Sequence, residues 1–452
     1  MAKPVCFVLM PFGVKMDAAG RAINFDHVYE QIFKPAVVAV DLLPIRADEE
    51  QAQGFIHKLM YERLLLSEYA IADLTLLNAN VYYELGVRHA AKPSTTVMTM
   101  AGQSGLPFDV AGLRVLPYAL DPTGNPVDAP GAAKALADQL RSYIEQEFVD
   151  SPIYQLVTGL KPLPIDPTLT DIFRERTKNS EGLKGQLAAA RASNEAGSIA
   201  SVEKSLGSIS DLEASVALDL LISYRAVSAH QEMIDLIGKL DRKLSQSVMV
   251  RQMLAFAQNK LGQWQEAEEI LVKLVAVQGP SSEASGLLGS VYKNRWENAT
   301  KAGKTYAAKA YLKQAINSYV AGFEADWRDP YPGVNALTLM EVADDSRRHA
   351  LLPVVRYLSE RRIVGRGHAA DYWDYASLLE IAVLADDSNL ADDMLGQALT
   401  VAGERWQLEA TARNLRVISD ARGARQANVD AVNAYLEELN KNISGWSNRK
   451  SG

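Results

Sequence analysis

Two acidic residues, Asp73 and Glu84, have the types and the spacing that could carry out chemistry in this chain. Asp73 ends an apolar run over 70–74, and Glu84 lies near the start of a helical segment over 81–91. Because ligands bind at the carboxyl ends of parallel strands, we expect both carboxylates in one crevice. Such a pair suits cleavage of an N-glycosidic bond: one carboxylate stabilises or traps the cationic sugar carbon, and the other orients a sugar hydroxyl or transfers a proton.

A structural role for Glu84 is the alternative. An acid at the start of a helix is favoured by the helix dipole. A capping box explains this residue poorly, since with Asn80 as the N-cap the partner in the box would be Tyr83. The residues themselves leave both roles open.

Short apolar runs alternate with helical segments up to about residue 150. Strands that are apolar throughout and separated by helices are typical of a parallel sheet covered on both faces. We therefore predict a five-stranded Rossmann-like or flavodoxin-like α/β domain. Its strands are expected at 5–10, 42–45, 70–74, 95–100 and 113–120, and its helices at 25–39, 55–69, 81–91 and 132–148.

Further polar and turn residues follow the first two predicted strands. Pro11, Phe12 and Gly13 come after the first strand, and Arg46 and Asp48 come after the second. Their places at the carboxyl edge of the sheet make them candidate substrate-binding residues beside the two acids.

The second half of the chain has a different pattern of apolar residues, with no convincing strand after about residue 167. Three prolines between 162 and 167 break any regular element, and 188–208 is expected to form a loose helix or a connection. The segment 261–267 fits the turn of a tetratricopeptide repeat, and Ala255 and Gly289 are 34 residues apart, which is the period of that repeat. We predict an all-α solenoid of about eleven to fourteen helices, with a generic helical bundle as the alternative.

These patterns predict three parts: an α/β domain over 1–160, a linker and helical connection over 161–210, and a helical-repeat domain over 211–445.

The composition excludes several classes of protein. The 452 residues include 47 Lys and Arg against 55 Asp and Glu, a net charge of −8 that argues against general nucleic-acid binding. The single Cys6 excludes a disulfide scaffold or a zinc ribbon. Six scattered histidines show no metal-ligand spacing, so neither a metal nor a cofactor is expected. No apolar run is long enough for a membrane helix, and without a signal peptide we expect a cytoplasmic protein.

The segment 73–90, DLTLLNANVYYELGVRHA, resembles the signature helix of the nucleoside 2-deoxyribosyltransferase-like superfamily, which is related to the TIR domains. FVLMPFG, FDHVY, RADE and PFDVAGLRVLPY occur in the expected order around it, so the resemblance covers about residues 4–160. It implies that Glu84 is the nucleophile and that Asp73 helps to bind the sugar. It also implies a site loop at Pro11–Gly13, a polar site residue at Asn80, and a homo-oligomer, since TIR-like sites are often completed by a neighbour.

The repeat half resembles the TRAF-binding region of apoptosis-signal-regulating kinases, a tetratricopeptide-like scaffold. The matching segments are SEASGLLGSVYK (282–293), GFE (322–324), YPGVN (331–335), DYW (371–373) and WQLE (406–409). A chain that joins these two domains resembles proposed bacterial immune-signalling proteins. In those proteins the repeats are suspected of sensing a nucleotide-derived ligand or a protein partner.

One basic concentration lies in the repeats. Guanidinium groups suit phosphate, so these arginines could line an anion pocket on the concave face of a solenoid. The alternative is a solvated surface on which they pair with Asp344, Asp345 and Glu360. The candidate arginines are Arg347, Arg348, Arg361, Arg362 and Arg366.

Two functional hypotheses follow. The first is an enzyme that cleaves an N-glycosidic bond in a nucleotide, NAD or a nucleoside, regulated by the repeats in immune or stress signalling. The second is a non-catalytic nucleotide-binding sensor or scaffold that recruits a partner through its repeats.

Overall fold

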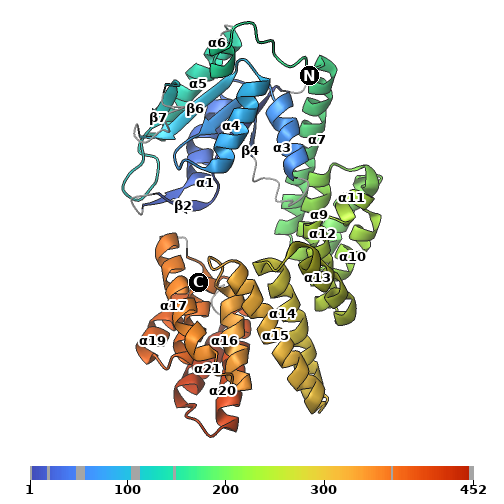
Figure 1. Ribbon diagram of the computed structural model, residues 1–452, viewed down its shortest axis with the longest axis vertical. Coiled ribbons are helices and arrows are strands. Elements are labelled where there is room, and N and C mark those ends of the chain that lie inside the picture. Colours follow the sequence, from blue (N-terminus) through green and yellow to red (C-terminus); the bar gives the residue numbers. More distant parts are fainter. Residues whose placement is uncertain are drawn as a thin grey trace. The chain divides into compact units, whose positions relative to one another are not determined.

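The computed structural model describes residues 3–17, 21–46, 56–102, 112–145, 149–367 and 370–446 (Figure 1). The side chains of 56–59, Asp211 and Arg366 are outside that description. The chain divides into two compact units, Met1–Met249 and Val250–Gly452. The three parts expected from the sequence were defined by their secondary structure, whereas these two units are defined by how compactly the chain packs. The division into three parts therefore stays a prediction.

A parallel five-stranded sheet forms the first part of the chain. Its strands are β1 (Val5–Leu9), β4 (Leu43–Arg46), β5 (Tyr69–Asp73), β6 (Thr96–Ala101) and β7 (Val115–Tyr118), in the order β4-β1-β5-β6-β7. This is the flavodoxin-like order, in which the chain reverses direction across the sheet between β1 and β5. The carboxyl ends of those two strands therefore flank the expected crevice.

Helices cover both faces of the sheet (Figure 1). Apolar side chains of the first helical stretch and of α5 pack on one face, and those of α3 and α4 pack on the other. The apolar runs of the strands are buried for this reason. The helices are α1 (Phe25–Val28), the π-helical turn η1 (Tyr29–Phe33), α2 (Lys34–Val38), α3 (Ile56–Leu66), α4 (Ala79–Ala91), α5 (Ala129–Glu145) and α6 (Pro152–Leu156).

A small antiparallel hairpin lies beside the sheet and was not predicted. Its strands, β2 (Val14–Met16) and β3 (Ala22–Asn24), have three residues each, too few to show an alternating pattern. Gly13 precedes β2 with a φ of 65°, a conformation that favours glycine. The loop after β1 therefore leads directly into this hairpin.

The guanidinium of Arg88 makes five hydrogen bonds inside the α/β domain and has no exposed surface. It donates to the main-chain oxygens of Leu64 and Ser67 at 2.9 and 2.8 Å and to that of Glu68 at 3.1 Å. It also donates to the hydroxyls at the start of β6, Thr95 and Thr96. Burial lowers the pKa of Arg88 to about 10, so the group stays charged at neutral pH.

Long helices follow the sheet. The segment 188–208, expected to be a loose helix or a connection, contains the end of α7 and the whole of α8. Phe173 of α7 packs into the core on the α3–α4 face, and Arg174 pairs with Glu68, which fixes α7 to the α/β domain. The helices of this stretch are α7 (Pro167–Ala192), α8 (Ala196–Ser205), the 3₁₀ turn η4 (Ile209–Asp211), α9 (Ala214–Ala226), α10 (His230–Lys239) and α11 (Arg242–Ser245).

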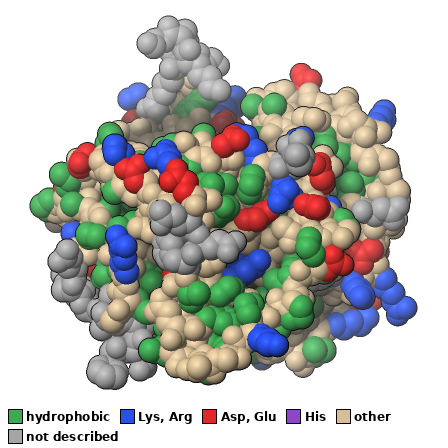
Figure 2. Space-filling model, turned by 90° about the horizontal axis from the view of Figure 1, so that it is seen from above, with side chains coloured by type: hydrophobic (Ala, Val, Ile, Leu, Met, Phe, Trp, Pro, Cys, Tyr) green, Lys and Arg blue, Asp and Glu red, His purple; other side chains and the backbone are tan. Residues whose placement is uncertain are grey.

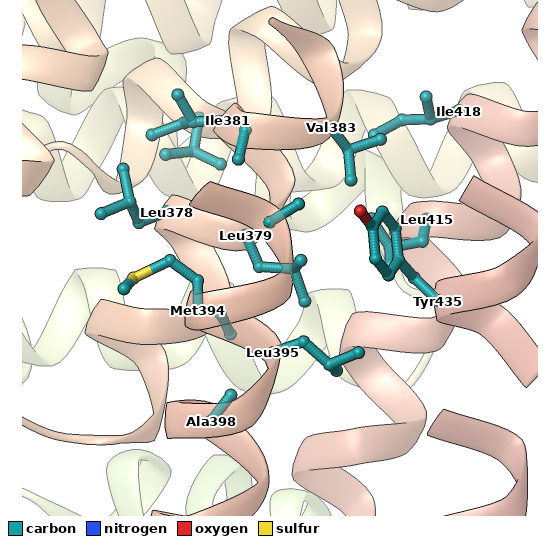
Figure 3. Packing of buried hydrophobic residues seen from close by; sticks show 14 of the residues in the cluster. Leu378, Leu379, Ile381, Val383, Met394, Leu395, Ala398, Leu415, Ile418 and Tyr435 are labelled. Carbon is teal, nitrogen blue, oxygen red and sulfur yellow. The ribbon is translucent and has the colours of Figure 1, made fainter. Parts of the chain in front are cut away.

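Helical hairpins make up the second unit. Gly289 in α14 sits against the ring of Tyr319 in α15, and a Cβ there would come within 2.8 Å of several ring atoms. Figure 3 shows the core of the later hairpins, where Leu379, Leu395 and Leu415 meet. The helices are α12 (Val248–Lys260), α13 (Trp264–Gln278), α14 (Ser282–Lys301), α15 (Thr305–Ala325), α16 (Tyr331–Ala343), α17 (Arg348–Arg366), α18 (Tyr372–Leu384), α19 (Ser388–Val401), α20 (Arg405–Ala424) and α21 (Asp430–Ser444).

The predicted fold class, a parallel α/β domain followed by an all-helical repeat region, is confirmed. Among the described residues no helix is long and apolar enough to cross a membrane. Acidic and basic side chains are interspersed on the face seen in Figure 2, in keeping with the mixed charge of the sequence.

We expect Arg88→Met to lower the free energy of unfolding of the first unit by about 3–5 kcal/mol, because three main-chain oxygens would lose a charged donor inside the core. Urea unfolding followed by circular dichroism measures the change. Arg141→Met is the matched control, since that arginine is half-exposed and pairs only with Asp138 among the described residues. Equal midpoints for the two variants would contradict the role assigned to Arg88.

Candidate functional site

Asp73 ends β5 at the carboxyl edge of the sheet and is 1% exposed. Its carboxylate accepts hydrogen bonds from the Thr75 amide at 3.0 Å, from the Thr75 hydroxyl, and from the Tyr118 hydroxyl at 2.9 Å. Burial raises the pKa of Asp73 to about 6, and these donors limit the rise. The acid therefore ties β5 to the end of β7 across β6, a positioning role that leaves little of its surface for a ligand.

Glu84 lies on α4, the helix that follows β5. Its side chain is partly buried, and among the described residues it makes no hydrogen bond or ion pair. Burial raises the pKa of Glu84 to about 7, so near neutral pH both protonation states are populated. A carboxyl group that has a pKa near neutral pH and no structural partner is typical of functional sites.

The start of α4 differs from the expectation. Asn78, not Asn80, is the N-cap, and its side-chain oxygen accepts from the amides of Asn80 and Val81. Glu84 is consequently in the second turn of the helix, where the helix dipole gives it little stabilisation. Asn80 is exposed in the first turn, and nothing in its contacts assigns it to a site.

The loop after β1 and the end of β4 are brought together through Asp26. The Asp26 carboxylate accepts from the Gly13 amide at 3.2 Å and pairs with Arg46 at 2.9 Å. Arg46 also lies over the ring of Tyr29 at 4.6 Å. Gly13 and Arg46, both predicted to bind substrate, therefore share one acidic neighbour.

The other residues of this predicted group are more scattered. Pro11 is buried, whereas Phe12 is 50% exposed with the Lys15 ammonium over its ring. Asp48 lies outside the described residues. An exposed phenyl ring at the mouth of a sheet crevice can stack on a ligand, so Phe12 is the member of this loop with an accessible contact surface.

The four candidate arginines of the repeats whose side chains are described do not form one cluster. Arg361 is exposed, and the side chain of Arg366 is not described. Arg348 and Arg361 lie about 20 Å apart along the axis of α17 at the rise of a regular helix. Three of the arginines are already ion-paired, as Arg347–Asp345, Arg348–Glu341 and Arg362–Asp374. The anion pocket stays a prediction.

Sequence reasoning missed the residues that hold the site in place. Thr75 and Tyr118 complete the Asp73 network, and Asp26 links Gly13 to Arg46. Only its position near the end of the last predicted strand, at the same edge of the sheet as Asp73, could have indicated Tyr118. Over the ranges that the structure describes, no group of three or more His, Cys, Asp or Glu is placed to hold a metal ion.

Two curated relatives are mitogen-activated protein kinase kinase kinases. The kinase nsy-1 of Caenorhabditis elegans is 25% identical over 220 residues, which are 44% of this chain and 14% of the kinase. Kinase 6 of Homo sapiens is 23% identical over 347 residues, which are 69% of this chain and 26% of the kinase. The chain thus corresponds to only a minor part of the length of these relatives.

Two solved tetratricopeptide-repeat structures are also similar. A protein from Thermus thermophilus matches with a TM-score of 0.34 and 17% identity, covering 45% of this chain and 99% of that one. One from Parabacteroides merdae matches with a TM-score of 0.32 and 12% identity, covering 59% and 98%. Scores this low do not define a shared fold, so the repeats are described from their own geometry.

A sequence family described as MAP3K TRAFs-binding domain matches residues 81–437. The match begins inside α4, so it includes β6, β7 and α5 of the α/β domain as well as the helical repeats. It supports the predicted resemblance of the second half and extends it towards the sheet. Because the match spans most of the sequence, this chain belongs to the MAP3K TRAFs-binding domain family.

Proposed function

We propose that the chain acts as a non-catalytic scaffold that recruits a protein partner, a TRAF-type adaptor, through its helical repeats. The observation that carries this proposal is the family match over 81–437, because the name of that family assigns TRAF binding to the matched region. The α/β domain would then serve as a sensor that binds a nucleotide without cleaving it, and a homo-oligomer would bring several repeat surfaces together.

Exposed aromatic side chains in the repeats support a role in partner binding. Trp373 and Trp406 are 41% and 55% exposed, and their rings lie 5.4 Å apart. Each is the second residue of its helix, α18 or α20, so both stand at the beginning of a repeat hairpin. Tryptophan is enriched at protein–protein interfaces, where its large ring contributes much of the binding energy.

A second candidate function rests on Glu84. In N-glycosidic cleavage its carboxylate oxygen would bond to the anomeric carbon while the base leaves with the electrons of the C–N bond and takes up a proton. Water would then hydrolyse the glycosyl ester and restore the carboxylate. The partly buried, unpaired carboxyl group favours this role, whereas Asp73 would act by holding the Thr75–Tyr118 network in place.

The scaffold proposal predicts that the full-length chain binds a purified TRAF protein in the micromolar range or tighter, measured by biolayer interferometry. Glu84→Gln should bind equally well, because the change lies outside the repeats. Absence of binding at about 100 µM TRAF protein would contradict the proposal.

The enzymatic candidate predicts release of a free base from one member of a mixture of NAD, NADP, ribonucleotides, deoxynucleotides and nucleosides. Glu84→Gln should abolish the release, and the wild-type rate should rise with pH through about 7 as the carboxylate forms. Mass-resolved chromatography of the products provides the measurement. Equal turnover by wild type and variant would exclude Glu84 as the catalytic residue.

Stability should depend on the same group. Burial raises the pKa of Glu84 from 4.5 to about 7, so the folded state binds more protons than the unfolded state between these values. Stability contributed by the protonated form is therefore present below pH 4.5 and is lost as pH rises towards 7. Over this window we expect the wild type to lose about 1–3 kcal/mol relative to Glu84→Gln, measured by urea unfolding at each pH. Parallel stability profiles would show that the carboxyl group is not desolvated.

A further inference from the structure

An apolar groove of about 670 Å³ lies in the repeat unit, formed by α14, α16 and α20. Helix α16 packs against both of the others, and the C-terminal part of each helix contributes lining residues. The volume is in the range of known binding pockets. The apolar lining comes from Trp296, Val342, Ala343, Val417, Ala421 and Ala424.

The α20 wall is a single stripe of that helix. Arg413, Val417, Ala421 and Ala424 recur at spacings of four, four and three residues, which places them on one face. At the rise of a regular helix the stripe is about 17 Å long, which corresponds to three turns. The α20 wall therefore has the length of one short helix laid along it.

Four of the charged side chains that border the groove make no hydrogen bond or ion pair with the described residues. Glu297 and Lys301 extend from α14, and Arg413 and Asp420 extend from α20. Within the described part of the chain none of the four makes a hydrogen bond or an ion pair. Several other charged residues of this unit are ion-paired, for example Arg295–Glu268, Arg356–Asp387 and Arg405–Glu409.

An unpaired lysine or arginine on a surface is ordinary. Here, however, three acids and three bases line one apolar floor. Asp344 and Arg425 are paired with Arg348 and Glu341, and the other four have no ion pair among the described residues. Each of α14 and α20 contributes one residue of either sign, so the border is complementary to a partner that also carries both signs. A uniformly basic or acidic ligand would meet like charge on either wall.

The backbone of the walls decides which kind of segment fits. The amides in the C-terminal turns of α14, α16 and α20 are bonded within their own helices, so an added strand would find no main-chain donors there. A helix satisfies its own backbone and can bury an apolar stripe without such partners. Ala343, Ala421 and Ala424 are small, which lets a partner helix approach closely.

We propose that this groove docks an amphipathic helix of a protein partner, about three turns long, with apolar residues at spacings of three and four. Its basic side chains face Glu297 and Asp420, and its acidic side chains face Lys301 and Arg413. The inference deepens the proposed scaffold function and rests on it, since it names one surface, apart from Trp373 and Trp406, through which the repeats hold a partner.

The test uses a phage-displayed library of helix-forming 18-residue peptides selected on the full-length chain. Selected peptides should carry an apolar stripe flanked by both acidic and basic residues. Arg413→Glu should weaken their binding at least tenfold in fluorescence anisotropy, whereas Arg416→Glu should change it less than twofold. Arg416 is an exposed arginine on the same helix that does not line the groove, so the two variants carry the same change of charge.

Two further measurements sharpen the result. Replacing the acidic peptide residue that faces Arg413 with lysine should restore binding to Arg413→Glu. Trp296→Phe should remove the change in tryptophan fluorescence that peptide binding causes, because Trp296 lines the groove. Circular dichroism melting of Arg413→Glu and Arg416→Glu should match the wild type, since both side chains are exposed.

Selection of extended peptides, of purely apolar peptides or of none would overturn the inference, as would equal weakening by Arg413→Glu and Arg416→Glu. Binding of the TRAF protein separates this outcome from failure of the scaffold proposal. If TRAF binds the wild type and Arg413→Glu equally well, the scaffold function stands and the groove assignment fails. If the peptides behave as expected but TRAF does not bind the wild type, the groove stands and the proposed function fails.

Discussion

The α/β domain depends on the buried guanidinium group of Arg88, which must be hydrogen-bonded because it is removed from water. Its N–H groups bond to the end of α3 and the starts of β5 and β6, so α4 is held to three other elements at once. Glu84 lies one turn earlier on the same helix, and its placement beside the sheet follows from that anchor. The repeat unit uses the same device: Arg422 donates to the Val383 oxygen at the end of α18, and Arg425 donates to the Glu341 oxygen near the end of α16.

The pattern of apolar runs was sufficient to predict the five strands, the parallel sheet and the main helices that cover it, because burial on both faces makes such strands apolar throughout. The hairpin of β2 and β3 could not be predicted, since three-residue strands have no readable period. The length of α7 was also missed. It carries few apolar residues, and anchors such as Phe173 become recognisable only when the neighbouring core is known.

The sequence could predict those site residues that lie next to a recognisable strand or helix. Glu84 was found from its place after a strand, and its unpaired, partly buried carboxyl group agrees with a functional role. Tyr118 was missed because its bond to Asp73 joins strands separated by β6. The arginines of the repeats were predicted to cluster because they are close in sequence. Helix α17 is long enough, however, to place Arg348 at one end and Arg361 and Arg362 near the other. Residues of α14 and α20 meet at one groove although more than 100 positions separate them.

The central proposal is that the protein partner binds to the repeats and not to the sheet edge. Hydrogen–deuterium exchange of the full-length chain, with and without a saturating TRAF protein, tests it most directly. The account predicts slower exchange in α14, α16 and α20 and unchanged exchange in β5 and α4. Protection confined to β5 and α4, with the repeats unaffected, would contradict it.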